Sequence, residues 1–232
     1  MPDEKQSSTG KTTEKLYIWD VPTRLFHWLL VIAVATALLS AELGKMSIHM
    51  IAGHVVLALV LFRLIWGVIG GHHARFASFI KGPGQVIAYA KRLISGEAPF
   101  HVGHNPMGGW SVLAILTLLA IQTGTGLFAN DDILTEGPLF SLVSKSTSNF
   151  LTLIHSICSV GIYTLIALHL AAVAFYTIKG HPIILAMLTG EAVNADALAH
   201  ERAASANVRG SSVAAVIVIL IAGAIAYAIK TY

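Results

Sequence analysis

Long apolar stretches separated by shorter polar ones dominate the pattern of this chain. Each stretch is long enough, or nearly so, for the roughly 20 residues that a helix needs to cross hydrocarbon. The five stretches cover residues 25–41, 48–70, 107–129, 150–178 and 213–229. A helix satisfies its own backbone hydrogen bonds and is therefore stable in lipid. The pattern predicts an all-α protein with five transmembrane helices.

The polar segments divide the chain into four parts. Residues 1–16 contain no apolar run and predict a solvated, cytoplasmic tail. Residues 17–188 hold the first four spans and predict a transmembrane four-helix bundle. An Ala-rich cytoplasmic linker over 189–211 leads to a fifth transmembrane helix within 212–232, whose small side chains suit close packing against a neighbour. A cleaved signal peptide is disfavoured, because a long polar segment precedes the first span.

Composition narrows the class of protein. Hydrophobic residues make up 55% of the chain and charged residues only 12%, which argues against a soluble enzyme and against disorder. The pI of about 9.0 comes from only 15 Lys and Arg against 12 Asp and Glu, so no nucleic-acid partner is expected. The single cysteine, Cys158, and the lack of a Cys-x-x-Cys-His motif exclude covalently attached c-type haem.

The basic residues predict the orientation of the helices. Segment 71–106 is basic, as is the N-terminal tail, whereas segments 42–47 and 130–149 carry one lysine each and the second is acidic. Basic loops stay on the cytoplasmic side of a bacterial inner membrane. We therefore expect a multi-pass inner-membrane protein with a cytoplasmic N-terminus.

Four histidines lie clearly inside apolar stretches, where ionisable side chains are costly and are candidates for function. They are His27, His54, His155 and His169. His49 is a borderline fifth, at the start of a predicted helix. His155 and His169 are two heptads apart, so they share one face of their helix and are separated by about 21 Å along its axis.

The predicted orientation pairs these histidines by depth, His54 with His155 and His27 with His169. Two imidazoles from facing helices can bind both axial positions of one b-type haem, so the chain is expected to hold two haem b groups. Arg24 and Arg63 are candidates to neutralise haem propionates. Small residues beside the histidines leave room for a macrocycle: Gly53, Gly124 and Gly126.

Other interpretations of these side chains stay open. Transmembrane histidines also form interhelical hydrogen bonds, bind metal ions or relay protons, so a metal-ion transporter is an alternative from another class. His104 lies where the third span enters the membrane and could contact a quinone. The acidic segment 130–149 could dock a basic periplasmic electron carrier or could simply be solvated.

The chain resembles bacterial cytochrome b561 and the cytochrome b subunit of nickel-iron hydrogenases between residue 17 and about residue 190. The similarity rests on the segments 19–28, 53–54, 103–106 and 125–129, on the acidic pair Asp131-Asp132, and on the two histidines of the fourth span. It implies a four-helix di-haem core with His27, His54, His155 and His169 as ligands. The polar leader and the fifth helix depart from the compact members of the family.

These observations predict an inner-membrane di-haem cytochrome of a respiratory chain, in which electrons pass between the quinone pool and a periplasmic redox partner. The partner would be a c-type cytochrome or an oxidoreductase subunit. The alternative within the same scaffold is a stand-alone superoxide:quinone oxidoreductase, which would need a basic outer surface to attract an anion. Whether the chain is itself an enzyme, and whether it forms a homo-oligomer, stays open.

Overall fold

The computed structural model describes residues 15–97, 101, 103–193 and 210–231. Five of its helices are long and apolar enough to cross a membrane. They are α1 (Val21–Glu42), α2 (Met46–Ile69), α5 (Pro106–Gly126), α6 (Lys145–Ile178) and α9 (Ser212–Lys230). The predicted all-α fold with five transmembrane helices is confirmed, and each helix lies within a few residues of the expected stretch.

Side-chain caps determine where most of these helices begin. Asp20 accepts a hydrogen bond from the backbone N–H of Thr23 at the start of α1, and Asn105 does the same for Gly108 at the start of α5. Such caps satisfy backbone donors that have no partner inside the helix. Helix α6, with 34 residues, is about 51 Å long and therefore longer than the roughly 30 Å of bilayer hydrocarbon.

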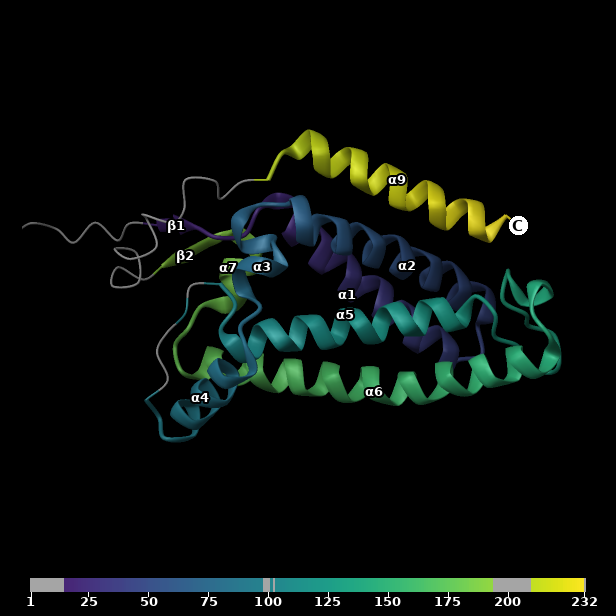
Figure 1. Cartoon of the computed structure of the whole chain (residues 1–232), viewed down its shortest axis with the longest axis horizontal. Coiled ribbons are helices and arrows are strands. Elements are labelled where there is room, and N and C mark those ends of the chain that lie inside the picture. The colour runs from purple at the N-terminus through teal and green to yellow at the C-terminus, as the bar shows by residue number, and fades with distance from the viewer. Residues whose placement is uncertain (1–14, 98–100, 102, 194–209, 232) are drawn as a thin grey trace, which may run out of the picture.

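The helices form two antiparallel pairs, α1 with α2 and α5 with α6, and α2 also packs against α5 and α9 (Figure 1). We call the two ends of the bundle the sheet end and the loop end. The sheet end carries β1 (Lys15–Tyr17), η1 (His72–Ala74), α3 (Phe76–Phe79), α4 (Pro83–Ile94), α7 (Ile183–Thr189) and β2 (Glu191–Val193). The loop end carries the turn 43–45 and the connection 127–144, which includes η2 (Phe140–Leu142).

A short antiparallel sheet joins the two ends of the four-helix region, and the sequence did not predict it. Lys15 pairs with Val193 and Tyr17 with Glu191, and the backbone N–H of Ile18 donates to the Gly190 carbonyl at 2.8 Å. Gly190 has a φ of 87°, and a side chain there would lie 2.8 Å from a backbone oxygen. The expected tail and linker therefore contain paired segments at their inner ends. The rest of both, residues 1–14 and 194–209, lies outside the described residues.

Helix α9 packs along α2 (Figure 1). The side chains that it buries are small and lie along one stripe: Ala215, Val218, Ala222 and Ala226. Small residues let two helix backbones approach closely, which gains van der Waals contact where lipid offers no hydrophobic driving force. The expected close packing of the fifth helix is confirmed, and its neighbour is α2.

Candidate functional site

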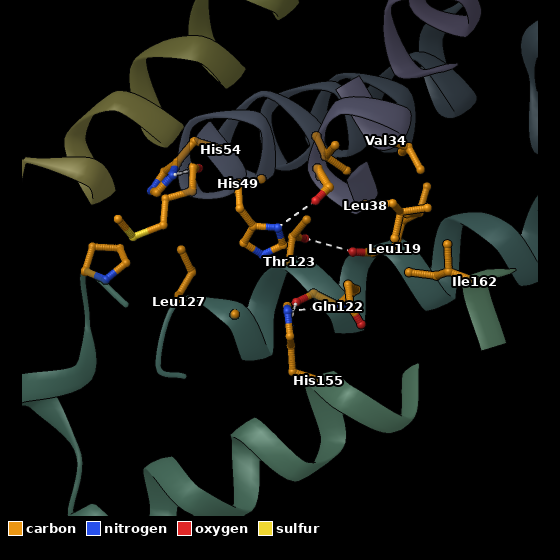
Figure 2. Close-up of a pocket in the computed structure, with 16 residues that line it drawn as sticks. Val34, Leu38, His49, His54, Leu119, Gln122, Thr123, Leu127, His155 and Ile162 are labelled. Carbon is orange, nitrogen blue, oxygen red and sulfur yellow. Dashed lines mark hydrogen bonds between the residues drawn. The ribbon is translucent and has the colours of Figure 1, made fainter. Parts of the chain in front are cut away.

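A cavity with three histidines lies at the loop end of the bundle, between α1, α2, α5 and α6. It encloses about 680 Å³ of space free of protein atoms, part of which is open to the surroundings. Figure 2 shows His155 extending from α6 toward His49 and Gln122, with His54 on the other side of His49. The lining is otherwise mainly apolar.

His155 is held by α5. Its Nδ1 lies 2.9 Å from the Gln122 carbonyl oxygen, and its Nε2 lies 3.0 Å from the Gln122 side-chain nitrogen. Since a carbonyl can only accept, Nδ1 carries the hydrogen and Nε2 carries the lone pair. A side chain at Gly126 would meet the His155 ring at 2.9 Å, so the glycine leaves room for this imidazole.

Two histidines on α2 reach the same cavity. The rings of His49 and His155 are 6.1 Å apart between centroids, at 87° to each other. His49 Nδ1 lies 2.8 Å from the Ala37 carbonyl of α1, and His54 Nδ1 lies 2.7 Å from the Met50 carbonyl. In each ring, this leaves Nε2 as the nitrogen with a free lone pair, and a hydrogen bond from the second nitrogen is typical of metal-binding histidines. The Nε2 atom of His54 is buried and has no partner.

A second pair of histidines meets at the sheet end. His27 of α1 and His169 of α6 have ring centroids 6.5 Å apart. The Nδ1 atom of His27 is buried without a hydrogen-bond partner. The structure therefore brings together the two histidines that their predicted depths paired, and both pairs use α6.

The ring separations suit two imidazoles bound to one metal ion. A nitrogen lies about 2 Å from the metal that it binds, and the ring centre lies about 1 Å further away, so two opposed rings have centres about 6 Å apart. The pairs His27–His169 and His49–His155 have 6.5 and 6.1 Å. Both pairs therefore have a separation at which two imidazoles could hold one haem b, and the Nε2 of His155 would have to release its hydrogen bond with Gln122 to do so.

The structure brings His54 and His155 to one cavity, as expected from their depth, but the ring that faces His155 is that of His49. Among the residues that the structure describes, no ring contact joins His54 to His155. In the sequence, His49 is only a borderline candidate because the apolar stretch begins at residue 48. Helix α2 in fact begins at Met46, and a carbonyl of α1 positions the ring. An earlier start of the predicted helix, which would have placed His49 inside it, is the sequence signal that could have favoured His49.

Both candidate arginines lie at the sheet end. Arg24 donates from Nη1 to the Leu188 carbonyl and so joins α1 to α7, while its Nε is buried without a partner. Arg63 is only 2% exposed, and its guanidinium lies over the Phe76 ring at 4.8 Å from the centroid. Its Nη1 has no hydrogen-bond partner. Both side chains therefore keep a donor that could bind an anionic group at the sheet end.

His104 packs between two aromatic rings at the sheet end. Its ring centroid lies 4.8 Å from that of Trp19 and 4.5 Å from that of Phe79. Burial, with Arg63 nearby, lowers the pKa of His104 to about 3. Burial, with the neighbouring His72, lowers the pKa of His73 to about 4. Both imidazoles are therefore neutral at pH 7, and Nδ1 of His104 is buried with no partner.

The lowered pKa values of His73 and His104 predict that the protein loses stability in mild acid. The unfolded chain binds protons on both below pH 6.5 and the folded chain does not, so the free energy of unfolding falls as the pH drops from 6.5 toward 4. At pH 5 each histidine should cost about 2 kcal/mol. Thermal unfolding in detergent between pH 7.5 and 5 measures this, and His104→Phe should flatten the dependence. An unchanged slope in that variant would contradict the assignment to His104.

The described residues contain no group of three or more His, Cys, Asp or Glu side chains that could hold a metal ion by themselves. The histidines instead form facing pairs. A pair leaves the remaining coordination positions of a metal to another group, as the planar ring of a haem provides.

Comparison with known proteins identifies the family of this chain. The family profile described as prokaryotic cytochrome b561 matches residues 18–190. The chain is 26% identical over 163 residues to a probable Ni/Fe-hydrogenase B-type cytochrome subunit of Azotobacter vinelandii, covering 54% of this chain and 67% of the relative. It is 23% identical over 147 residues to the protein of the same name in Cupriavidus necator, covering 51% and 59%.

The chain thus spans about two thirds of the length of these relatives or somewhat less. No solved structure matches it. The matched segment contains both histidine pairs and the first four membrane-spanning helices. The chain therefore belongs to the prokaryotic cytochrome b561 family and is a multi-pass membrane b-type cytochrome of electron transfer.

Proposed function

We propose that this chain is an inner-membrane di-haem cytochrome b that transfers electrons between the quinone pool and a periplasmic redox partner. The observation that carries the proposal is the pair of facing imidazoles at each end of one bundle, with ring centroids 6.5 and 6.1 Å apart. Helix α6 supplies one histidine to each pair, and these two lie about 21 Å apart along its axis. Two haems so placed would span most of the roughly 30 Å of bilayer hydrocarbon.

His27 and His169 would hold the haem at the sheet end. At the loop end, His155 would share a haem with a histidine of α2, and its 6.1 Å ring approach favours His49 over the expected His54. A haem held by two imidazoles would supply one-electron transfer and would leave no position for oxygen. The unpartnered donors of Arg24 and Arg63 suit propionates of the sheet-end haem.

A pair of variants separates the two candidates on α2. We expect His49→Ala to remove the loop-end haem and to lower the haem content from two to about one per chain, because an imidazole with no opposing ligand holds haem weakly. His54→Ala should keep two haems. Haem content against protein concentration and reduced-minus-oxidised spectra measure both. If His54→Ala loses a haem while His49→Ala keeps both, His155 shares its haem with His54 and not with His49.

The quinone would react near the sheet-end haem. His104 lies at this end beside Trp19, and its buried Nδ1 has no partner, so it suits a hydrogen bond to a quinone carbonyl. His104→Gln keeps a donor and His104→Phe removes it. In membranes, we expect haem reduction by a quinol to slow more in His104→Phe, with unchanged haem content. Equal rates in the two variants would remove His104 from the quinone site.

The loop end would face the periplasm, because four basic residues of segment 71–106 lie at the sheet end, on or beside η1 and α4: Arg75, Lys81, Lys91 and Arg92. Asp131 and Asp132 lie on the loop end, although Lys145 forms an ion pair with Asp132 and neutralises part of this charge. A partner with a basic docking surface would complement the negative charge that remains at the loop end. Since the relatives are named as hydrogenase subunits, a nickel-iron hydrogenase is the oxidoreductase to test first by copurification.

A haem assay tests the function as a whole. Purified chain should show two b haems, both reduced by quinol in proteoliposomes and reoxidised by an added periplasmic acceptor. A single haem per chain, or haems that quinol leaves oxidised, would overturn the proposal.

A further inference from the structure

Helix α4 lies outside the membrane-spanning bundle but at its edge. It follows α2 and precedes α5, and it lies beside the sheet-end termini of α5 and α6 (Figure 1). The Tyr89 hydroxyl lies 3.0 Å from that of Tyr176, two residues before the end of α6. Asn105, the cap of α5, donates to the same Tyr176 hydroxyl at 3.0 Å. These bonds fix α4 at the level where α5 begins and α6 ends.

That level is the surface of the bilayer. The spans of α2 and α5 end and begin at Ile69 and Pro106. Trp110, in the first turns of α5, is 43% exposed and donates from its indole N–H to the Lys81 carbonyl at 2.8 Å. Exposed tryptophans of this kind gather at the boundary between headgroups and hydrocarbon. The segment that leads into α4 is therefore held at this boundary.

The apolar arc of α4 is wider than its contact with the protein. Val86, Tyr89 and Leu93 recur at helical spacing and form the side that packs toward the bundle, with Tyr89 buried. Ile87 and Ile94 lie next to this side, seven residues apart on one ridge, and are 57% and 88% exposed. We call Ile87 and Ile94 the ridge. It needs an apolar environment that the described residues do not supply.

Basic side chains lie in the last turn of α4 and just before the helix. Lys91, on the same side as the ridge, and Arg92, on the polar side, are both exposed in the last turn. Lys81 is exposed just before the helix. Among the described residues, the salt bridge lies at the loop end, between Lys145 and Asp132. In this part of the chain, no ion pair neutralises the three cations near the ridge. An apolar ridge on a helix that also carries exposed cations is the pattern of a helix that lies in the headgroup region of an anionic membrane.

We propose that α4 is an interfacial helix that binds the anionic phospholipid headgroups surrounding the protein. The ridge inserts below the headgroups, while Lys91 and Arg92, with Lys81, contact lipid phosphates. Charge complementarity and the position of α4 at the bilayer surface favour lipid over a protein partner, which would have to fit between this helix and the membrane. The proposal requires only that the chain spans a membrane, and it holds whichever partner or quinone the haems serve.

Depth-dependent fluorescence quenching tests whether the ridge enters lipid. Cys158→Ser leaves the chain without a cysteine, so a single fluorophore can be placed by Ile94→Cys or, as the matched control on the polar side, by Gln85→Cys. In proteoliposomes with lipids brominated near the headgroup, we expect at least about twofold stronger quenching at position 94 than at position 85. Equal quenching at both positions would overturn the insertion of the ridge, as would shielding of position 94 by a copurifying protein.

Lipid selectivity tests the cations. In nanodiscs of phosphatidylcholine with phosphatidylglycerol, native mass spectrometry counts the lipids that the full chain retains. We expect Lys91→Gln with Arg92→Gln to lower the preference for phosphatidylglycerol by about fivefold per residue, because each cation near an anionic surface contributes about that factor. The control, Lys45→Gln with Lys230→Gln, removes two exposed cations at the loop end and should keep the preference.

Two results would overturn lipid binding by α4. One is an unchanged preference in the Lys91 and Arg92 variant, and the other is an equal loss in the control, which would indicate net charge alone. All variants should keep the haem spectrum of the parent protein, since α4 contributes none of the histidine pairs. This readout separates a failure of the lipid proposal from misfolding and from a failure of the haem proposal.

Discussion

Replacing both histidines of α6 by alanine is expected to abolish haem binding, while each single replacement should leave one haem. His155 and His169 each face a histidine from another helix, at 6.1 and 6.5 Å between ring centroids. Loss of either ring would remove one of the two imidazoles proposed to hold a haem and would leave the other alone at membrane depth. Because the pairs are separated by about 21 Å along α6, the two losses should be independent.

The measurement is haem per chain together with the absorbance of the reduced protein. We expect about two haems in the parent, one in each single variant and none in the double variant. The spectrum lost in His155→Ala should differ from that lost in His169→Ala. Cys158→Ala, one turn from His155, is the matched control and should keep both haems. Two haems in either single variant would show that α6 does not supply both ligands.

Trp66→Ala is expected to have the largest effect on stability. Trp66 is 0% exposed, and its ring stacks on that of Phe62 at 5.8 Å between centroids. Its indole N–H donates to Asp20, the cap of α1, at 3.2 Å. A side chain at Gly210, just before α9, would meet the Trp66 ring at 2.4 Å. One side chain thus joins α2 to the start of α1 and to the segment that leads into α9.

Removing this ring would leave a cavity, and it would leave Oδ2 of Asp20 without its hydrogen bond while Oδ1 still caps α1. Truncation of a buried aromatic side chain costs about 3–5 kcal/mol in the free energy of unfolding. For a chain of this size, the midpoint of thermal unfolding should fall by about 10 °C. Trp66→Phe keeps the stacking and loses only the hydrogen bond, so it should cost less. A shift of the midpoint as small in Trp66→Ala as in Trp66→Phe would show that the packing contributes little.

Most of the fold was predictable because the membrane restricts what an apolar segment can form. Hydropathy alone placed five helices, and α9 was expected to pack through small residues, which it does against α2. The strands Lys15–Tyr17 and Glu191–Val193 were not predictable. Each is three residues long, and the two pair only because α1 and α7 bring distant segments together.

The candidate site was predictable to a lesser degree. His155 and His169 are 14 residues apart, which places both on one face of any long helix, so the use of α6 by both pairs followed from spacing. The sequence pairs His155 with His54 by depth, whereas the ring contact that the structure adds is the one with His49. His49 and His54 are both on α2 near its start, and the choice between them depends on how α1, α2 and α6 cross.

The sequence by itself therefore determined the class of the protein, its helices and the depth of its polar side chains, because burying charge in lipid is costly wherever it occurs. Only the tertiary structure decided which imidazoles face each other, that Arg63 and His104 lie beside one another at the sheet end, and that α4 leaves an apolar ridge uncovered. Depth is a property of one helix and can be counted in residues. Contact between two side chains depends on how several helices rotate and cross. Differences of a few ångströms in helix packing decide this.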